Sequence, residues 1–167
     1  MAAEQADAVL ALYDRALPEV YGYLLSRCHD VQIAEDLAAD TFLAAVSGVR
    51  RGTVADLTVA WLVAVARNKL VDHWRRLERE ERKLRLVHDE DNGMTDEWDV
   101  RLDAAVAHGV LADLGAHHRA ALSLRYLDGL SVPEVAEALG RTVHATEALL
   151  VRARVAFRRA YAERGEG

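Results

Sequence analysis

The sequence is poor in the residues that mark disulfide-bonded and membrane-spanning proteins. Cys28 is the one cysteine among 167 residues, so an internal disulfide and a site of paired cysteine ligands are excluded, and we expect a buried, inert thiol. No run approaches the roughly 18 apolar residues that a spanning helix requires. Residues 1–7 carry acids where a secretory signal carries basic residues. We therefore expect a cytoplasmic protein without membrane insertion.

Proline is also scarce, with Pro18 and Pro133 as the two examples. Apolar residues recur at three-to-four spacing nearly throughout, which is typical of helices and not of strands. We predict an all-α protein of two small helical domains joined by an acidic flexible linker, the C-terminal domain being a helix-turn-helix. The helices are expected at about 5–27, 31–47, 57–86, 100–113, 117–127, 132–139 and 143–162, with a basic loop at 47–53.

Basic residues are outnumbered, 21 against 27 acids, and the net charge of −6 argues at first against nucleic acid as a partner. The charges are sorted along the chain, however. Residues 1–46 hold 2 basic and 8 acidic side chains, 47–87 hold 10 and 5, 88–118 hold 1 and 8, and 119–167 hold 8 and 6. Such blocks suit a protein that presents basic faces to nucleic acid at two places, the alternative being chance clustering of solvated charge.

A helix-turn-helix is predicted near the C-terminus. Ser131 and Glu134 have the spacing of a capping box, and Gly140 follows where that helix must end. The next helix mixes apolar residues with Arg152, Arg154, Arg158 and Arg159. It has the character of a recognition helix for the major groove, although a glycine turn before a basic helix also occurs in proteins that do not bind DNA.

The expected helix 57–86 has two faces at about 100° per residue. We predict a core face made of Val59, Leu62, Val63, Ala66, Leu70, His73, Trp74, Leu77 and Leu84. The opposite side gathers Asn68, Asp72, Arg75, Arg76, Arg79 and Lys83, with Trp61 and Val65 among them and Arg67 at the edge. Aromatics among arginines suit single-stranded nucleic acid, because bases stack on them. For Trp61 we favour the plainer interpretation, packing on a neighbouring helix.

Asp36 and Asp40 lie one turn apart in the expected helix 31–47. This like-charge pair destabilises an isolated helix by a few tenths of a kcal/mol. A basic partner surface would compensate, and favourable placement of Glu35 and Asp36 near the positive helix start is an equal alternative.

Three segments resemble the extracytoplasmic-function (ECF, group 4) RNA polymerase sigma factors of the sigma-70 family. Residues 34–46 (AEDLAADTFLAAV) are similar to the polymerase-binding helix of that family. Residues 60–76 (AWLVAVARNKLVDHWRR) are similar to its helix for the −10 element. Residues 120–140 (AALSLRYLDGLSVPEVAEALG) are similar to its domain four, which binds the −35 element. The segments follow the family's order and spacing over nearly the whole chain.

The resemblance implies sigma domain two at 8–86, a linker at 87–99 and sigma domain four at 100–163. Domain two would bind the clamp helices of the largest subunit of core RNA polymerase through Glu35, Asp36, Asp40 and Phe42. It would capture a melted −10 base with the loop 47–57 and Asn68. Its expected contacts to −10 DNA are Arg50, Arg51, Trp61, Arg67, Asn68, Asp72, Arg75 and Arg76. Domain four would bind the polymerase flap, and an anti-sigma factor is a further expected partner.

The expected contacts to −35 DNA are Arg141, Thr142, His144, Thr146, Glu147, Arg152 and Arg154. The family commonly has Lys-Ser-Arg where this sequence has Glu147, Ala148 and Leu149. Two cations are therefore lost, while Glu147 gains the ability to accept a hydrogen bond from a cytosine amino group. The promoter sequence is left open by this departure.

Two other classes of function have less support. A conventional helix-turn-helix regulator would dimerise on a palindrome and would have no use for the acidic helix 31–46 or a second basic helix with Asn68. An enzyme or metal site would have to use the seven histidines. His117 and His118 are the adjacent pair, and neighbours on a helix point about 100° apart, which is poor for one metal. We expect no catalysis, no metal and no cofactor.

Overall fold

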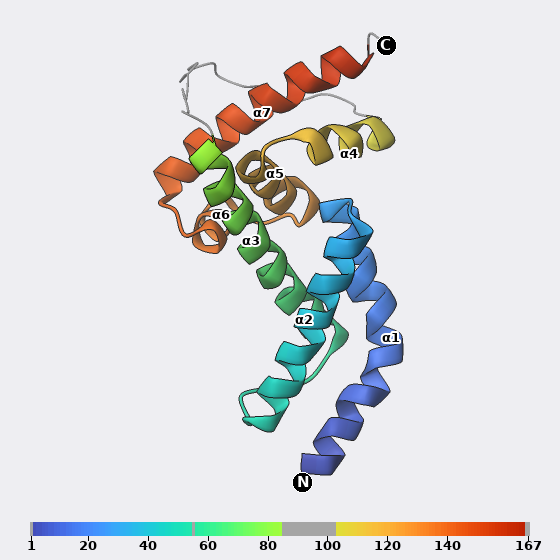
Figure 1. The fold of residues 1–167 in the computed structure, drawn as a ribbon. Coiled ribbons are helices and arrows are strands. Elements are labelled where there is room, and N and C mark those ends of the chain that lie inside the picture. The colour runs from blue at the N-terminus through green and yellow to red at the C-terminus, as the bar shows by residue number, and fades with distance from the viewer. Residues whose placement is uncertain (1, 55, 85–102, 166–167) are drawn as a thin grey trace. The chain divides into compact units, whose positions relative to one another are not determined.

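The computed structural model describes residues 2–54, 56–84 and 103–165, and the elements of these residues are helices without a strand (Figure 1). This confirms the predicted all-α class. The chain divides into two compact units, Met1–Asp72 and His73–Gly167, and the boundary between them falls within the helix Val59–Leu84. The predicted linker 87–99 lies outside the described residues. The elements are α1 (Ala2–Cys28), α2 (Val31–Arg50), α3 (Val59–Leu84), α4 (Ala104–Asp113), α5 (Ala116–Leu122), η1 (Ser123–Leu127), α6 (Val132–Leu139) and α7 (Val143–Gly165).

In the first unit α1 and α2 pack side by side and run in opposite directions (Figure 1). The reversal takes two residues. His29 has a positive φ of 54°, and Asp30 caps α2 by accepting a hydrogen bond of 3.1 Å from the amide of Ile33. The two helices bury a shared set of apolar side chains, which includes Ala16, Val20, Leu24, Ala34, Leu37 and Ala45. As expected, Cys28 is a buried free thiol.

The predicted loop 47–53 is wrong in its first half, because α2 continues to Arg50. Gly48 lies within the helix, and a Cβ added there would sit 2.7 Å from Cγ2 of Val54. Thr53 closes the turn by donating its amide to the carbonyl of Gly48 at 3.0 Å, and Gly52 supplies the positive φ of 69°. Glycine at 48 therefore marks close packing inside a helix and not the helix end.

The predicted core face of α3 is confirmed over its central turns. Leu62, Ala66, Leu70 and Trp74 are buried. Leu84 is 88% exposed, so its assignment to the core was wrong. It is the last residue of α3, and helical periodicity alone extends an apolar stripe past the turns that have something to pack against.

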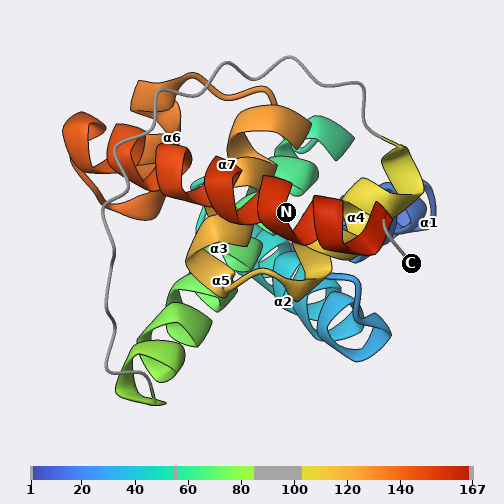
Figure 2. The same cartoon turned by 90° about the horizontal axis from the view of Figure 1, so that it is seen from above.

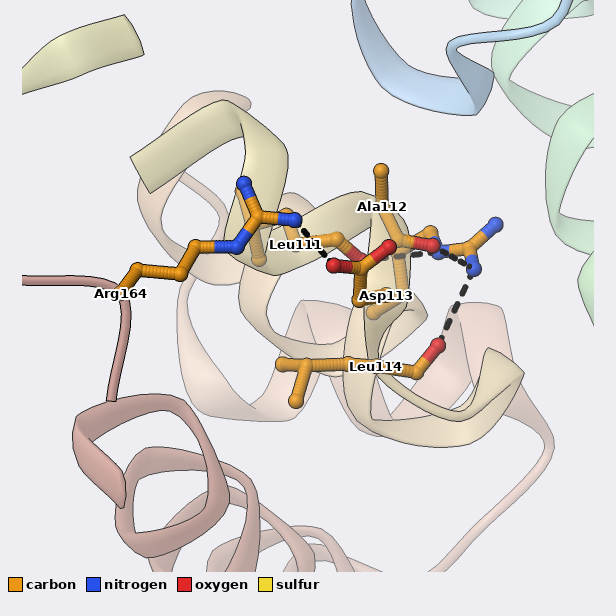
Figure 3. A network of polar contacts seen from close by, with 6 residues as sticks. Leu111, Ala112, Asp113, Leu114 and Arg164 are labelled. Carbon is orange, nitrogen blue, oxygen red and sulfur yellow. Dashed lines mark hydrogen bonds and ion pairs between the residues drawn. The ribbon is translucent and has the colours of Figure 1, made fainter. Parts of the chain in front are cut away.

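In the second unit, α7 packs against α4, α5 and α6, and Figure 2 shows it running past them. A core cluster joins α4, α5 and α7, and it is made of Val110, Leu111, Leu122, Ala153 and Phe157. The C-terminal end of α4 is held by two arginines (Figure 3). Arg164 pairs with Asp113. Arg119 donates 3.0, 2.7 and 3.0 Å hydrogen bonds to the carbonyl oxygens of Leu111, Ala112 and Leu114. The guanidinium of Arg119 thereby adds a cation and three hydrogen bonds at the negative end of the helix.

The helix-turn-helix has the predicted caps. Ser131 and Glu134 form the full capping box, with amide contacts of 3.3 and 3.1 Å. Gly140 adopts the left-handed conformation with φ 64°. The predicted helix 117–127 differs in detail, because α5 passes into a π-helical turn, η1, in which the amide of Asp128 bonds to the carbonyl of Ser123 at 3.0 Å. In the part of the chain described, no helix has the length and apolar character to cross a membrane.

Candidate polymerase and nucleic-acid interfaces

An acidic face follows one side of α2. The side chains of Glu35, Asp36 and Asp40, three of the predicted polymerase contacts, are exposed. Leu43 is 67% exposed and lies one turn beyond Asp40, so the face ends in a bare apolar side chain. Leu43 was missed by sequence reasoning, although its spacing from Asp36 and Asp40 places the three on one helix face. Among the described residues, the face therefore combines three exposed carboxylates with one exposed leucine.

Phe42, the fourth predicted polymerase contact, is 8% exposed and belongs to the core. Its ring centroid lies 4.8 Å from that of Tyr13 on α1. The two rings help to form a groove of about 530 Å³ between α1 and α2, whose lining also includes Leu17, Tyr21 and Glu35. Phe42 therefore lines the groove as a largely buried residue, while the carboxylates of Asp36 and Asp40 are exposed to solvent.

The predicted −10 contacts on α3 form an exposed stripe. Asn68, Asp72, Arg75 and Arg76 are exposed and lie three to four residues apart. Trp61 and Arg67 are half-buried. The hydroxyl of Thr58 accepts the amide of Trp61 at 3.0 Å and so caps the start of the helix.

Arg50 and Arg51 are exposed at the end of α2. Arg51 donates a 2.7 Å hydrogen bond to the hydroxyl of Ser47, one turn earlier. This contact holds its guanidinium beside the helix end. The two cations therefore stand on the last turn of a helix and its cap, and not in the free loop that the sequence suggested.

The predicted −35 contacts on α7 divide by burial. His144 and Glu147 are exposed, whereas Thr146 is fully buried and donates its hydroxyl to the carbonyl of Thr142 at 2.8 Å. The hydroxyl of Thr142 accepts the amide of Ala145 at 3.1 Å and acts as a helix cap. Thr146 thus supports the helix start from inside the core, and its side chain does not reach the surface.

Arg152 and Arg154 are two residues apart, so their side chains leave the helix in directions that differ by about 160°. Arg154 lies on the side of Glu147, whereas His144 lies about 80° from each of the two arginines. Its guanidinium donates a 3.1 Å hydrogen bond to the hydroxyl of Tyr126, which is 44% exposed in η1. Sequence reasoning missed Tyr126, because no local spacing signals a contact across 28 residues. Helix spacing therefore puts Arg154 on the side of Glu147 and Arg152 on the opposite side of His144.

Arg141, in the turn before α7, faces a carboxylate in the same unit. Its guanidinium donates to Glu78 near the end of α3 at 2.6 Å. The side chains are 21% and 16% exposed. A predicted DNA contact is therefore occupied by an acid of the chain itself.

Two family models match the chain in sequence order. Sigma-70 region 2 matches residues 12–80, and Sigma-70, region 4 matches residues 108–157. The first match contains the acidic face of α2 and most of α3. The second contains the helix-turn-helix.

Relatives that match most of this chain are also RNA polymerase sigma factors. The ECF RNA polymerase sigma factor SigL of Mycobacterium tuberculosis is 33% identical over 146 residues, which cover 83% of this chain and 80% of SigL. The ECF RNA polymerase sigma factor BldN of Streptomyces coelicolor is 32% identical over 90% of this chain, which spans 59% of BldN. Among solved structures, the sigma factor RpoE of Bartonella quintana shares the fold, with a TM-score of 0.53 and 24% identity over 89% of this chain and 92% of that one.

The two region models match the segments that contain the acidic face of α2, most of α3 and the helix-turn-helix, and SigL is similar over 83% of this chain. A conventional regulator without polymerase binding is not favoured by these matches. The chain therefore belongs to the extracytoplasmic-function group of the sigma-70 family, and it is an RNA polymerase sigma factor that directs promoter-specific transcription.

Proposed function

We propose that the chain divides this work between sigma domain two, residues 8–86, and sigma domain four, residues 100–163. The observation that carries the proposal is the acidic face of α2, with Asp36, Asp40 and Leu43 exposed side by side. A factor that only binds DNA has no use for such a face, because phosphates repel it. A basic and partly apolar protein surface fits it, and the clamp helices of the largest polymerase subunit are the partner that the family implies.

The stripe on α3 is the proposed −10 surface. Asn68 can bond to a base that has left the stack, while Arg75 and Arg76 provide charge for phosphates. Arg50 and Arg51 add two cations at the end of α2. Trp61 and Arg67, both half-buried, would complete the surface at its edge.

The exposed side of α7 is the proposed −35 surface. His144 and Glu147 lie in the first turns of the helix, where a recognition helix contacts base edges. Arg154 lies further along the same side and, with Arg141 in the preceding turn, is placed for phosphates. Thr142 serves as the cap of the helix, the buried Thr146 is left out of this surface, and Arg152 would lie at its other edge, beyond His144.

The remaining partners and the place of action are also proposals. We propose that domain four binds the polymerase flap, that the protein acts in the cytoplasm, and that it has no catalytic activity of its own. An anti-sigma factor is a further proposed partner. RpoE of Bartonella quintana, which has the same fold, was solved in complex with the anti-sigma factor NepR.

The test is reconstitution with bacterial core polymerase. The protein should co-elute with core polymerase in gel filtration and start run-off transcription from its native upstream region. Asp36→Arg should abolish both, because it places a cation against a basic partner. Asp7→Arg, the same change at an exposed position of α1, should behave as wild type. Tight binding of duplex DNA without any binding to core polymerase would overturn the proposal.

A further inference from the structure

Three residues at successive turns near the end of α3, Arg75, Glu78 and Glu81, contact the helix-turn-helix unit at three points. All of them belong to the compact unit His73–Gly167. Spacing of three residues puts them on one side of the helix. The contacts involve the turn between α6 and α7 and the start of α5.

The central contact is the ion pair between Glu78 and Arg141. The two atoms Oε1 and Nη2 lie 2.6 Å apart, and both side chains are largely shielded from water. Glu78 also pairs with Arg82 on its own helix at 2.9 Å. If Arg141 left, the carboxylate would keep Arg82 as a partner. Breaking this contact therefore does not strand an unpaired charge on α3, which makes the pair suited to reversible opening.

The second contact caps α5. Gly115 precedes that helix and supplies no side-chain cap. The carboxylate of Glu81 accepts the amide of Ala116 at 3.2 Å and takes the place of the missing cap. An acid at the positive helix start is favourable.

The third contact is a close approach at Gly140. A Cβ on this residue would lie 3.0 Å from the guanidinium nitrogen Nη2 of Arg75. Glycine is favoured here by its φ of 64°, and the guanidinium of Arg75 lies close to it. Arg75 belongs to the proposed −10 surface and Arg141 to the proposed −35 surface. The three contacts therefore involve one cation from each proposed DNA surface.

We propose that Arg75, Glu78 and Glu81 form a latch that holds the helix-turn-helix in a masked state in the free protein. The inference rests on the proposed −35 role of Arg141. In the latched state the carboxylate of Glu78 neutralises Arg141, and it would repel an approaching phosphate. Binding to DNA requires Arg141 to exchange the carboxylate for a phosphate, so the latch must open first. Free protein would consequently bind −35 DNA more weakly than unlatched protein does.

The test compares the double variant Glu78→Gln, Glu81→Gln with Glu80→Gln. Glu80 is exposed on the same helix and is not one of the three latch residues, so it controls for the loss of one of the two negative charges near DNA. Fluorescence anisotropy measures the affinity of each free protein for a duplex that carries the native −35 region. The double variant should bind this duplex at least about 5-fold more tightly than Glu80→Gln does. Hydrogen exchange, measured without DNA, should be faster at Ala116 in the double variant alone.

Each outcome has a defined meaning. Unchanged exchange at Ala116 overturns the latch itself. Faster exchange with a DNA affinity equal to that of Glu80→Gln overturns the masking role. Failure of wild-type protein to start promoter-specific transcription with core polymerase, together with faster exchange in the double variant, defeats the proposed function and leaves the latch standing as a contact without a DNA role.

Discussion

Neighbouring residues on α7 show how one residue step decides between core and surface. Thr146 is fully buried and bonded to its own helix, while Glu147 is exposed. Both were predicted as −35 contacts, since a sequence window does not tell which of two neighbours points outward at a helix start. Exposure leaves Glu147 as the residue able to contact a base.

Replacing Glu147 with alanine should broaden −35 recognition. A carboxylate that accepts a hydrogen bond from a cytosine amino group contributes about 1–3 kcal/mol of discrimination against other bases. The variant should lose this discrimination at one position of the −35 element. Selection of preferred −35 sequences by the reconstituted holoenzyme measures this. Glu137→Ala, at an exposed acid of α6, is the matched control. An unchanged sequence preference in Glu147→Ala would show that the carboxylate does not contact a base.

Leu43 on the acidic face of α2 can be tested as a contact to core polymerase. Leu43→Ala should weaken binding to core polymerase, because burying a leucine side chain contributes about 1.5–3 kcal/mol. Leu10→Ala is a matched control, since Leu10 on α1 has the same exposure of 67%. Titration of labelled protein with core polymerase gives both affinities. Equal affinities for the two variants would remove Leu43 from the interface.

At the scale of elements, the end of α2 depends on packing that propensity opposes. Gly48 lies inside the helix, where glycine is less favourable than alanine by about 1 kcal/mol. The structure explains the choice, because Val54 folds back onto that position. The same contact places Arg50 and Arg51 at a helix end.

Gly48→Ala should therefore destabilise the protein by about 1–3 kcal/mol through overpacking. In a Val54→Ala background the clash is relieved, and the same change should be neutral or stabilising by up to about 1 kcal/mol. Urea unfolding of the four proteins in this cycle measures the difference. A stabilising effect of Gly48→Ala in the wild-type background would contradict the close packing.

At the scale of the whole molecule, net charge is a poor guide to partners. The chain carries −6, yet 18 of its 21 basic residues lie in residues 47–87 and 119–167, the two segments that contain the proposed nucleic-acid surfaces. Phosphate binding depends on the local cations that displace counterions and not on the total. A protein therefore does not need a positive net charge to bind a promoter.

Two variants with the same total charge should consequently differ. Arg154→Gln should weaken promoter binding by the holoenzyme for all sequences and reduce the slope of log K against log salt by about 1. Arg15→Gln, at an exposed site of α1, should leave the slope unchanged. The slopes come from binding measured over a range of sodium chloride concentrations. Equal slopes would mean that total charge governs the interaction.

The sequence by itself determined the helical class, the caps at Ser131 and Gly140 and the central core stripe of α3. These follow from local spacing and from backbone conformations that few residues adopt, so a short window contains them. It also indicated the family, because the quoted motifs stand in order along the chain.

Only the tertiary structure decided which candidate side chains are available. It buried Phe42 and Thr146, exposed Leu43 and Leu84, and joined Tyr126 to Arg154. It also paired Arg141 with Glu78 across 63 residues of sequence. Such outcomes depend on what packs against each helix from distant parts of the chain, and periodicity within one helix holds no information about that.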